Sequence, residues 1–483
     1  MSSLRDIFNR KNNISIIAGE PKRAVMFLFW PLLLSYTVVA INGYLDSFWV
    51  SILGAQATSA VNAMMDIYLI IASVGAGMGV ACAVAISFQL GKEDADRAHV
   101  LASHAILLCF ILAIIVGLLM FILIDPMVHI MEIQNLRELS MQYILPLIMC
   151  NVTLLINGAM CGILRAEGAS VRVTIATLLN VTAAFFNPLF IIGFNMGVSG
   201  AAWGTIAGTL VSTAYLTYLF VSGSTTVRID FKGFRFSRTA FKELLMINVP
   251  YSVQNGVRKF SNMIEKAIMM IVAGSILGGA TIAVFSLPWS YIHMLECIGL
   301  AFGASMVPVV SFNIGRKNLE NASTAFNYTL KTALMPTLVI TGLIMLFAGP
   351  LISILTTDPS FAEYRRMMID VLLIISFAAP IYPIRDISYN MLQTMRKNKL
   401  CMWVALLQVA LKLVMMYIGG TLWGPTWMVV FNVVSNWIGG LIAFFLARYY
   451  WKHFYPQMLK ITSYEEKLMD DLESMNEKRE SSA

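Results

Sequence analysis

The sequence S-F-Q-L-G-K at residues 87–92 recurs as S-F-N-I-G-R at residues 311–316. Each copy ends a long apolar run, and each places a glycine directly before a basic residue. A pattern that recurs at the end of two long apolar runs indicates that the chain contains an internal repeat. The two copies therefore predict a fold built from two related halves.

Proline spacings support the same division. Gly91 and Gly315 lie 35 residues before Pro126 and Pro350, and Pro31 and Pro250 lie 15 residues before Asp46 and Glu265. Each coincidence is weak alone, but the three together indicate a duplication. The equivalent acids, Asp46 and Glu265, become candidates for a shared role.

The composition indicates whether this repeated fold lies in water or in a lipid bilayer. Hydrophobic residues make up 58% of the 483 residues and charged residues only 13%, and the mean hydropathy is +0.73. A soluble chain carries roughly 25% charged residues. Runs of about 20 apolar residues are long enough to cross the hydrocarbon core of a bilayer. The chain is therefore expected to be an integral membrane protein.

Apolar segments of membrane-spanning length alternate with connections rich in charge, Gly, Pro or Asn. They are expected at residues 24–50, 61–87, 99–124, 139–163, 171–194, 199–222, 244–273, 280–312, 327–356, 366–393, 400–421 and 426–450. The predicted fold is all-α, a polytopic membrane protein with twelve transmembrane helices in two pseudo-symmetric six-helix lobes.

Lysine and arginine test this number of spans, because basic loops remain on the cytoplasmic side. One set of alternate connections holds nearly all of the basic residues, and the other holds only Arg137, Arg365 and Arg366. An odd number of spans would break this alternation. We therefore expect a multi-pass protein of the plasma membrane with both termini in the cytoplasm.

The longest basic connection divides the chain near its middle. The expected parts are a cytoplasmic N-terminal segment at 1–23, an N-lobe at 24–222, a cytoplasmic linker at 223–243, a C-lobe at 244–450 and a charged cytoplasmic tail at 451–483. Residues 1–23 are polar and basic, so the first apolar segment is expected to be a retained helix rather than a signal peptide.

Six spans per half give both halves the same orientation, so they should be related by an axis along the membrane normal. Two such bundles can rock about a site at their interface. This organisation favours a secondary transporter working by alternating access over a membrane enzyme.

Other function classes find no support. The net charge of +7 reports membrane orientation and not nucleic-acid binding. The six cysteines are dispersed in apolar stretches, which predicts neither a disulfide framework nor a metal site. Neither an HExxH motif nor a nucleophile elbow is present, so no catalysis and no cofactor are expected.

Four segments carry a resemblance to a known family. They are G-Y-L-D-S-F-W-V at 43–50, I-L-R-A-E-G at 163–168, N-P-L-F-I-I-G at 187–193 and M-G-V-S-G-A-A at 196–202. Through them the chain resembles the multidrug and toxic compound extrusion (MATE) family, within the superfamily that also holds polysaccharide and lipid flippases. The resemblance covers almost the whole chain.

This resemblance implies an exporter of amphipathic, often cationic compounds, driven by inward movement of H⁺ or Na⁺, with a cavity between the lobes. It also implies a cation site inside the N-lobe. The first-span acid of that site matches Asp46, the fourth-span amide matches Asn157, and the sixth-span hydroxyl matches Thr205.

The fifth span departs from the family pattern. Where Asn and then Asp are usual one turn apart, this chain has Ala183 and Asn187. Asn180, one turn before Ala183, is a candidate replacement for the amide, but nothing replaces the carboxylate.

Asp46 is the leading candidate for ion coupling, because an ionised side chain at the bilayer centre costs about 2.5 to 3.5 kcal/mol and is seldom present without a role. A lone acid shielded from water suffices to take up and release a proton. Na⁺ needs charge compensation and a ring of oxygens, so H⁺ is favoured, with Na⁺ at Asp46 as the alternative. A purely structural role, in which Asp46 hydrogen-bonds a broken helix, also stays open.

The C-lobe carries a second group of charged residues. Glu265 occupies the position equivalent to Asp46, with Arg258 seven residues earlier and Lys259 beside it, while Arg385 and Asp386 are adjacent in the tenth span. Two interpretations remain open for these residues. They form an internal ion-pair network, or the basic ones meet an anionic substrate in the cavity.

The leading hypothesis is an exporter of small organic compounds coupled to H⁺ or Na⁺. The first alternative is a flippase for a lipid or lipid-linked oligosaccharide, and the second is a polytopic lipid-modifying enzyme. The expected partners are a small organic substrate or amphipathic lipid and the membrane lipids, with no nucleic acid, and the protein is expected to be a monomer.

Overall fold

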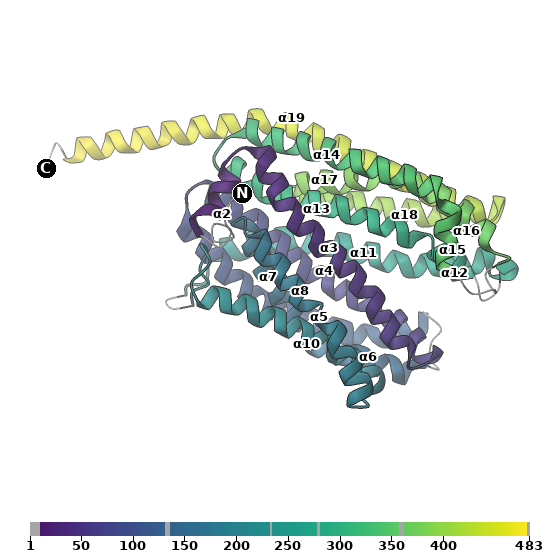
Figure 1. The fold of residues 1–483 in the computed structure, drawn as a ribbon. Helices are drawn as coiled ribbons and strands as arrows, with labels where there is room; N and C mark the ends of the chain where they lie inside the picture. The colour runs from purple at the N-terminus through teal and green to yellow at the C-terminus, as the bar shows by residue number, and fades with distance from the viewer. Residues whose placement is uncertain (1–9, 131–135, 232–233, 278–280, 357–361, 481–483) are drawn as a thin grey trace.

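The structure is a computed structural model that describes residues 10–130, 136–231, 234–277, 281–356 and 362–480. These residues form helices joined by loops and contain no strand. Figure 1 shows the helices in two groups, which we call the N-lobe (α3 to α10) and the C-lobe (α11 to α19). The expected all-α fold is confirmed.

The N-lobe is preceded by a short helix, α2. These parts comprise α2 (Arg10–Ala18), α3 (Pro21–Ser51), α4 (Ala55–Gly91), α5 (Ala95–Ile130), α6 (Arg137–Met149), α7 (Asn151–Ala166), α8 (Ser170–Asn180), α9 (Ala183–Pro188), the π-helical turn η2 (Leu189–Gly193) and α10 (Gly197–Val221). The C-lobe comprises α11 (Arg238–Leu277), α12 (Thr281–Ser286), α13 (Trp289–Gly315), α14 (Leu319–Leu346), α15 (Ala348–Leu355), α16 (Arg365–Ser376), α17 (Ile381–Thr394), α18 (Asn398–Trp423) and α19 (Pro425–Glu480).

Membrane-spanning length recurs throughout both lobes. Among the described residues, 10 spans are long and apolar enough to cross a bilayer, and two bent helix pairs raise the number to 12. The bent pairs are α6 with α7, at 49°, and α16 with α17, at 41°. The chain is therefore a multi-pass membrane protein, as its composition predicts.

The fifth expected span, 171–194, is broken rather than continuous. It consists of α8, the short helix α9 and the π-helical turn η2. Pro188 lies at the end of α9 and has no N–H to donate, which interrupts the helical hydrogen bonds. A π-helical turn inserts extra backbone and re-aims the neighbouring side chains. Asn187 therefore lies where the backbone of the fifth span departs from a regular helix, directly before Pro188 and the π-helical turn.

Helices extend into two segments that were expected to lie outside the spans. Helix α11 begins at Arg238, so part of the expected linker 223–243 is helical. Helix α19 begins at Pro425 and continues to Glu480, through most of the expected charged tail. Residues 1–9 of the expected N-terminal segment and 481–483 of the tail lie outside the described residues.

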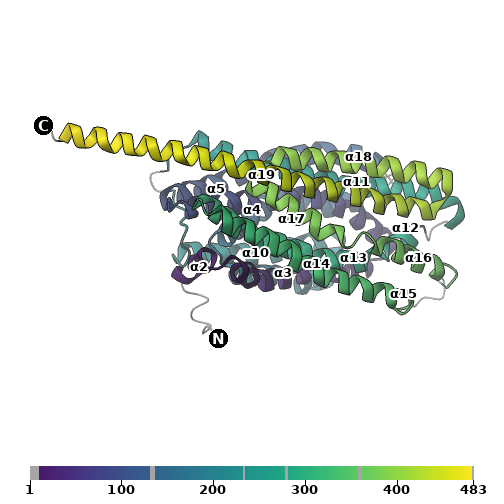
Figure 2. The ribbon, with the colours of Figure 1, turned by 90° about the horizontal axis from the view of Figure 1, so that it is seen from above.

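The lobes contact each other through several helix pairs, among them α4 with α13 and α3 with α14. Helix α4 also packs against α11, and α3 packs against α13. Figure 1 shows the lobes together at the end that holds α2 and diverging toward the end that holds α6 and α15. Figure 2 shows α11, α18 and α19 alongside one another in the C-lobe. We call the end near α2, which holds Lys92 and Arg316, the basic end.

The two copies of the repeated motif meet at this basic end. A Cβ atom added to Gly91 would overlap the carbonyl oxygen of Phe312, and one added to Gly315 would overlap the carbonyl oxygen of Phe88. The contact is therefore reciprocal, as expected for two equivalent halves related by a two-fold axis. Glycine is required in both motifs because the two backbones approach too closely for a side chain.

The connection between the lobes is bonded to the N-lobe. The carboxylate of Glu167 accepts hydrogen bonds from the backbone N–H groups of Thr226 (2.6 Å) and Val227 (3.1 Å). Arg172 donates to the carbonyl oxygen of Ser224 (2.8 Å). Three α5 side chains bind further backbone N–H groups: His99 that of Arg228, Ser103 that of Asp230, and His104 that of Ser237. The linker residues from Ser224 to Asp230, and Ser237, are thus attached to the N-lobe.

Candidate functional site

Asp46 lies in α3 between two amide side chains. The Nδ2 of Asn187 donates to Asp46 Oδ1 at 2.8 Å, and the Nδ2 of Asn42 donates to Asp46 Oδ2 at 3.0 Å. Asn42 precedes Asp46 by one turn of the same helix, so the two share a face. Asp46 is half-buried and Asn187 is buried. Both carboxylate oxygens of Asp46 therefore have a donor.

Close packing against α10 fixes the position of Asn187. A Cβ atom on Gly204 would overlap the Oδ1 of Asn187, so only glycine leaves room for this amide. Asn187 itself comes from α9, directly before the π-helical turn. The broken fifth span and a glycine of the sixth span thus hold the amide against the first-span acid.

Asp46 has no basic partner among the described residues. The ion pairs that these residues form include none to Asp46. The Oδ1 atoms of Asn42 and Asn187 are buried without a hydrogen-bond partner in the same part of the chain. The oxygen of each amide can therefore accept a hydrogen bond. A protonated Asp46 would need such an acceptor.

The other residues that the family resemblance assigned to this site bind elsewhere. Asn157 donates to Ser212 (2.9 Å) and Thr213 (3.2 Å) of α10. The hydroxyl of Thr205 donates to the carbonyl oxygen of Ala201 in its own helix. Asn180 is half-buried at the end of α8, and no hydrogen bond joins it to Asp46 among the described residues. Only Asn187 of this group contacts the acid.

A second polar site occupies the C-lobe. It is a cavity of about 380 Å³, which falls within the usual range of small-molecule sites. Its wall is formed by Asn255, Arg258, Lys259, Asn262, Glu265, Lys266, Met269, Ser286, Trp289, His293, Glu296, Leu300, Tyr382, Arg385, Gln408, Val409, Lys412, Asn432 and Asn436. Basic side chains outnumber carboxylates on this wall.

Glu265 forms an ion pair with Lys412 of α18. Its carboxylate also accepts from Ser261 (3.0 Å) and Asn432 (3.3 Å). From the sequence, Arg258 was one candidate partner for this acid because it lies on the same helical face, and Lys412 was expected to have a packing or interfacial position. A lone lysine inside an apolar span has the same insertion cost that drew attention to Asp46, so this signal was present in the sequence.

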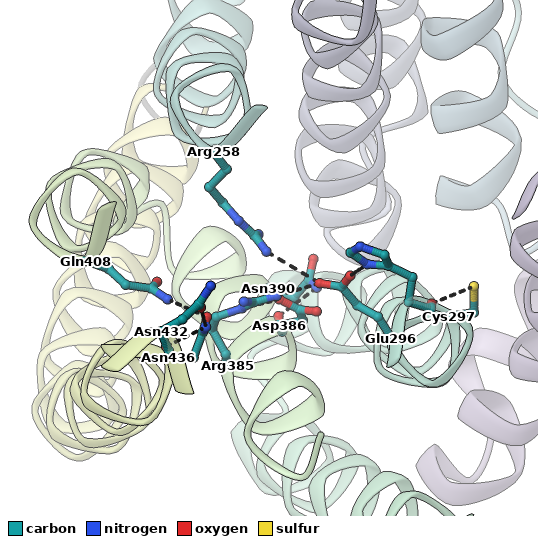
Figure 3. Close-up of polar contacts among 10 residues, drawn as sticks. Arg258, Glu296, Cys297, Arg385, Asp386, Asn390, Gln408, Asn432 and Asn436 are labelled. Atoms are coloured by element: carbon teal, nitrogen blue, oxygen red, sulfur yellow. Dashed lines mark hydrogen bonds and ion pairs between the residues drawn. The ribbon is translucent and has the colours of Figure 1, made fainter. Parts of the chain in front are cut away.

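Glu296 is the centre of a second charged group in the cavity, which Figure 3 shows with Arg258 and Arg385. Its Oε1 lies 2.8 Å from Arg385 and 3.5 Å from Arg258, and its Oε2 lies 3.3 Å from His293. Arg385 also pairs with the adjacent Asp386 at 2.8 Å, and its guanidinium lies 4.8 Å from the ring centre of Tyr382. Glu296 thus joins Arg258 to Arg385, and Arg385 in turn joins Glu296 to Asp386, so these residues form an ion-pair network.

A row of amides on α18 and α19 leads to Glu265, the other carboxylate of the wall, and Figure 3 shows its three members. Gln408 donates to Asn436 at 3.1 Å, and Asn436 donates to Asn432 at 2.8 Å. Asn432 then donates to Glu265. Buried amides that complete one another in this way rigidify a polar core. Single-sequence reasoning did not identify them, because amides within apolar spans carry no charge signal.

The comparisons with known proteins agree with this fold. The MatE family model matches residues 31–199 and 257–418, in both halves of the chain. The FAD transporter of Shewanella oneidensis is 22% identical over 371 residues, which cover 75% of this chain and 80% of that protein. Multidrug export protein MepA of Staphylococcus aureus is 19% identical over 428 residues, covering 88% of this chain and 93% of that protein.

Solved structures of the same family superimpose closely. A transporter of the MOP superfamily from Pyrococcus furiosus, described as having a binding pocket of reverse polarity, is 25% identical with a TM-score of 0.84. The match covers 91% of this chain and 98% of that structure. Because the family model matches both lobes and well over half of the residues, the chain belongs to the MatE family of membrane transporters.

Proposed function

We propose that the chain exports amphipathic organic compounds across the plasma membrane in exchange for H⁺, with Asp46 as the residue that carries the proton. The observation that supports this role is the environment of Asp46, which lies between Asn42 and Asn187 with no basic partner among the described residues. A carboxylate that is ionised without a countercharge inside a membrane protein is a site where a proton is readily taken up.

The two amides offer a physical route for coupling. When Asp46 is ionised, both of its oxygens accept hydrogen bonds from amide N–H groups. A protonated Asp46 becomes a donor and needs an acceptor, which the unpartnered Oδ1 of Asn187 supplies when the amide rotates. Because Asn187 belongs to the broken fifth span, proton uptake changes how α3 packs against α9 and α10.

Na⁺ is the less favoured coupling ion. A sodium ion needs several oxygen ligands, and the cluster offers one carboxylate with two amides that present N–H groups to it. The family's second acid is replaced by Asn187 in this chain. A proton binds to a single carboxylate oxygen and needs no further ligands, so the residues present fit H⁺ better than Na⁺.

The contact between the lobes supports an alternating-access mechanism. The reciprocal packing of Gly91 and Gly315 closes the basic end, and the lobes diverge toward the opposite end. If the basic end faces the cytoplasm, as its lysines and arginines favour, both termini are cytoplasmic and this arrangement faces outward. A single cysteine at Lys317 should then react with a membrane-impermeant maleimide in inverted vesicles and not in intact cells.

The test of coupling uses purified protein in proteoliposomes with an imposed pH or Na⁺ gradient, with ethidium as a cationic probe and riboflavin 5′-phosphate as an anionic one. Asp46→Asn should abolish transport driven by the pH gradient. Asp125→Asn is the matched control, because Asp125 is exposed and pairs only with Arg137. Gradient-driven transport that persists in Asp46→Asn, or that requires Na⁺ and ignores pH, would contradict the proposal.

A flippase for an anionic lipid-linked compound is the second candidate. The basic wall of the C-lobe cavity favours it, as does the reverse-polarity pocket attributed to the Pyrococcus furiosus relative. The same proteoliposomes decide between the two functions. Movement of a fluorescent phosphatidic acid between leaflets without transport of soluble probes would support the flippase and contradict the exporter.

A further inference from the structure

The charges of the C-lobe cavity do not balance. Five basic side chains line it, namely Arg258, Lys259, Lys266, Arg385 and Lys412, against the two carboxylates Glu265 and Glu296. Two further carboxylates, Asp66 and Asp386, pair with lining residues from behind the wall. Four carboxylates thus face five cations, and one positive charge remains.

The remaining charge belongs to Lys259. Lys412 pairs with Glu265, Lys266 with Asp66, and Arg385 with both Asp386 and Glu296. Lys259 lines the cavity and is half-buried, and it makes no ion pair with any carboxylate in the described part of the chain. The carboxylates of Glu296 and Asp66 attract this lysine without pairing with it, so an anionic ligand in direct contact with its ammonium group would be favourable.

Arg258 is the second residue available to a ligand. It shares Glu296 with Arg385, which takes the shorter bond of 2.8 Å and leaves Arg258 at 3.5 Å. Arg385 is 2% exposed and holds two carboxylates, so its role is structural, whereas the side chain of Arg258 is 28% exposed. Figure 3 shows Arg258 reaching from its own helix toward Glu296. An incoming oxyanion therefore competes for Arg258 and not for Arg385.

The rest of the wall is suited to an aromatic or apolar body. Trp289, Tyr382, Met269 and Leu300 line the cavity beside the charged residues. Aromatic and thioether side chains pack well against flat ring systems. A cationic compound would instead have to displace lysine or arginine from Glu265 or Glu296, next to an unpaired Lys259.

We propose that this cavity binds an organic phosphate ester with an aromatic body, and that Lys259 and Arg258 contact the phosphate while Trp289 contacts the ring. The proposal rests on the export function above for its physiological meaning and names the substrate class. Phosphate offers more than one oxygen, so it can accept from both residues at once.

The first experiment compares two fluorescent probes that differ by one phosphate, riboflavin 5′-phosphate and riboflavin, in binding to the purified full-length protein. The phosphate form should bind at least tenfold more tightly, since a charge-assisted hydrogen bond contributes about 1.5–3 kcal/mol, or roughly tenfold to a hundredfold in affinity. Lys259→Gln should remove most of this preference and leave riboflavin binding unchanged. Lys331→Gln, an exposed lysine of α14 outside the cavity, is the control.

A second variant separates the ring from the phosphate. Trp289→Ala should weaken both probes by a similar factor and so preserve the preference for the phosphate form. The melting temperature of each variant checks that the fold is retained. Equal binding of the two probes by the natural protein, or an unchanged preference in Lys259→Gln, would overturn the proposal.

Competition distinguishes the sources of phosphate. Adenosine 5′-monophosphate should displace riboflavin 5′-phosphate more effectively than either inorganic phosphate or dihexanoyl phosphatidic acid. Tighter competition by the phosphatidic acid would contradict the aromatic body. Because these measurements need no ion gradient, Asp46→Asn protein should still bind the phosphate probe. A failure of coupling is thereby separated from a failure of substrate binding.

Discussion

Asp66 of α4 and Lys266 of α11 form an ion pair at 2.9 Å that joins the two lobes. The carboxylate is nearly buried, with 10% of the Asp66 side chain exposed, while the Lys266 side chain is 43% exposed. The pair bridges the α4–α11 contact, and its lysine lines the C-lobe cavity. The ligand cavity and the contact between the lobes therefore share a side chain.

Breaking this pair should shift the balance between conformations of the transporter. A partly exposed ion pair contributes about 0.2–1 kcal/mol, so Lys266→Gln should change the ratio of conformers about two- to fivefold. Distances between spin labels on the two lobes measure this ratio. The exchanged variant, Asp66→Lys with Lys266→Asp, should restore the original distribution. The exposed Arg137–Asp125 pair, broken by Arg137→Gln, should leave the distribution unchanged.

The glycines of the repeated motif mark the place where a larger side chain should push the two lobes apart. Gly91→Ala places a methyl group against the carbonyl oxygen of Phe312 and should force the basic end apart. Overpacking of this kind costs about 1–3 kcal/mol. We expect reduced export and faster labelling of a cysteine introduced at the basic end. Gly342→Ala is the control, because nothing lies within 4 Å of its added Cβ. Full activity in Gly91→Ala would show that this contact is not part of the transport cycle.

Substitution of Gly204 should impair coupling as substitution of Asp46 does, because Gly204 leaves room for Asn187 beside Asp46. Gly204→Ala pushes Asn187 away from Asp46 and should reduce transport driven by the pH gradient while substrate binding persists. Asn187→Ala should have the same effect. Since both changes act through one contact, their effects should not add in the double variant. Independent, additive losses of transport would contradict this coupling.

Burial raises the pKa of Glu167 to about 7, although the N–H groups of Thr226 and Val227 and the charge of Arg172 act against this shift. A raised carboxyl pKa means that the folded protein favours the protonated acid. Its stabilising effect is present at low pH and is lost as the pH rises from about 4.5 through 7. We expect the Tm of the natural protein in detergent to fall by several degrees between pH 5 and 8. The Tm of Glu167→Gln should not show this fall with pH. Parallel plots of Tm against pH for the variant and the natural protein would contradict the assignment to Glu167.

The large-scale organisation was predictable because it rests on counting and spacing. The lengths of the apolar runs predicted the membrane spans. The recurrence of S-F-x-[L/I]-G-[K/R] predicted that the chain has two related halves. The position of Asn187 opposite Asp46 depends on a break in the fifth span that periodicity does not reveal. The sequence predicted a continuous helix there, whereas Pro188 and a π-helical turn interrupt it.

Pairing partners within the C-lobe were harder to predict. Glu265 and Lys412 are 147 residues apart, and nothing in one sequence states which faces of α11 and α18 meet. The sequence left Glu265, Glu296 and Asp386 open as partners of Arg258, and the structure pairs it with Glu296. Each charged residue in a span signals that a partner exists, but only packing between helices decides which one.

The reciprocal fit of Gly91 and Gly315 has an evolutionary consequence. A polypeptide of half this length, carrying one copy of the motif, would already present both surfaces of that contact. Two such molecules inserted in the same direction would make it twice, as a symmetric homodimer does. The present gene product has the architecture of that dimer after fusion, and fusion allows each half to specialise. Among the described residues, the first half holds Asp46 without a basic partner, and the second half holds a cavity with more basic than acidic side chains.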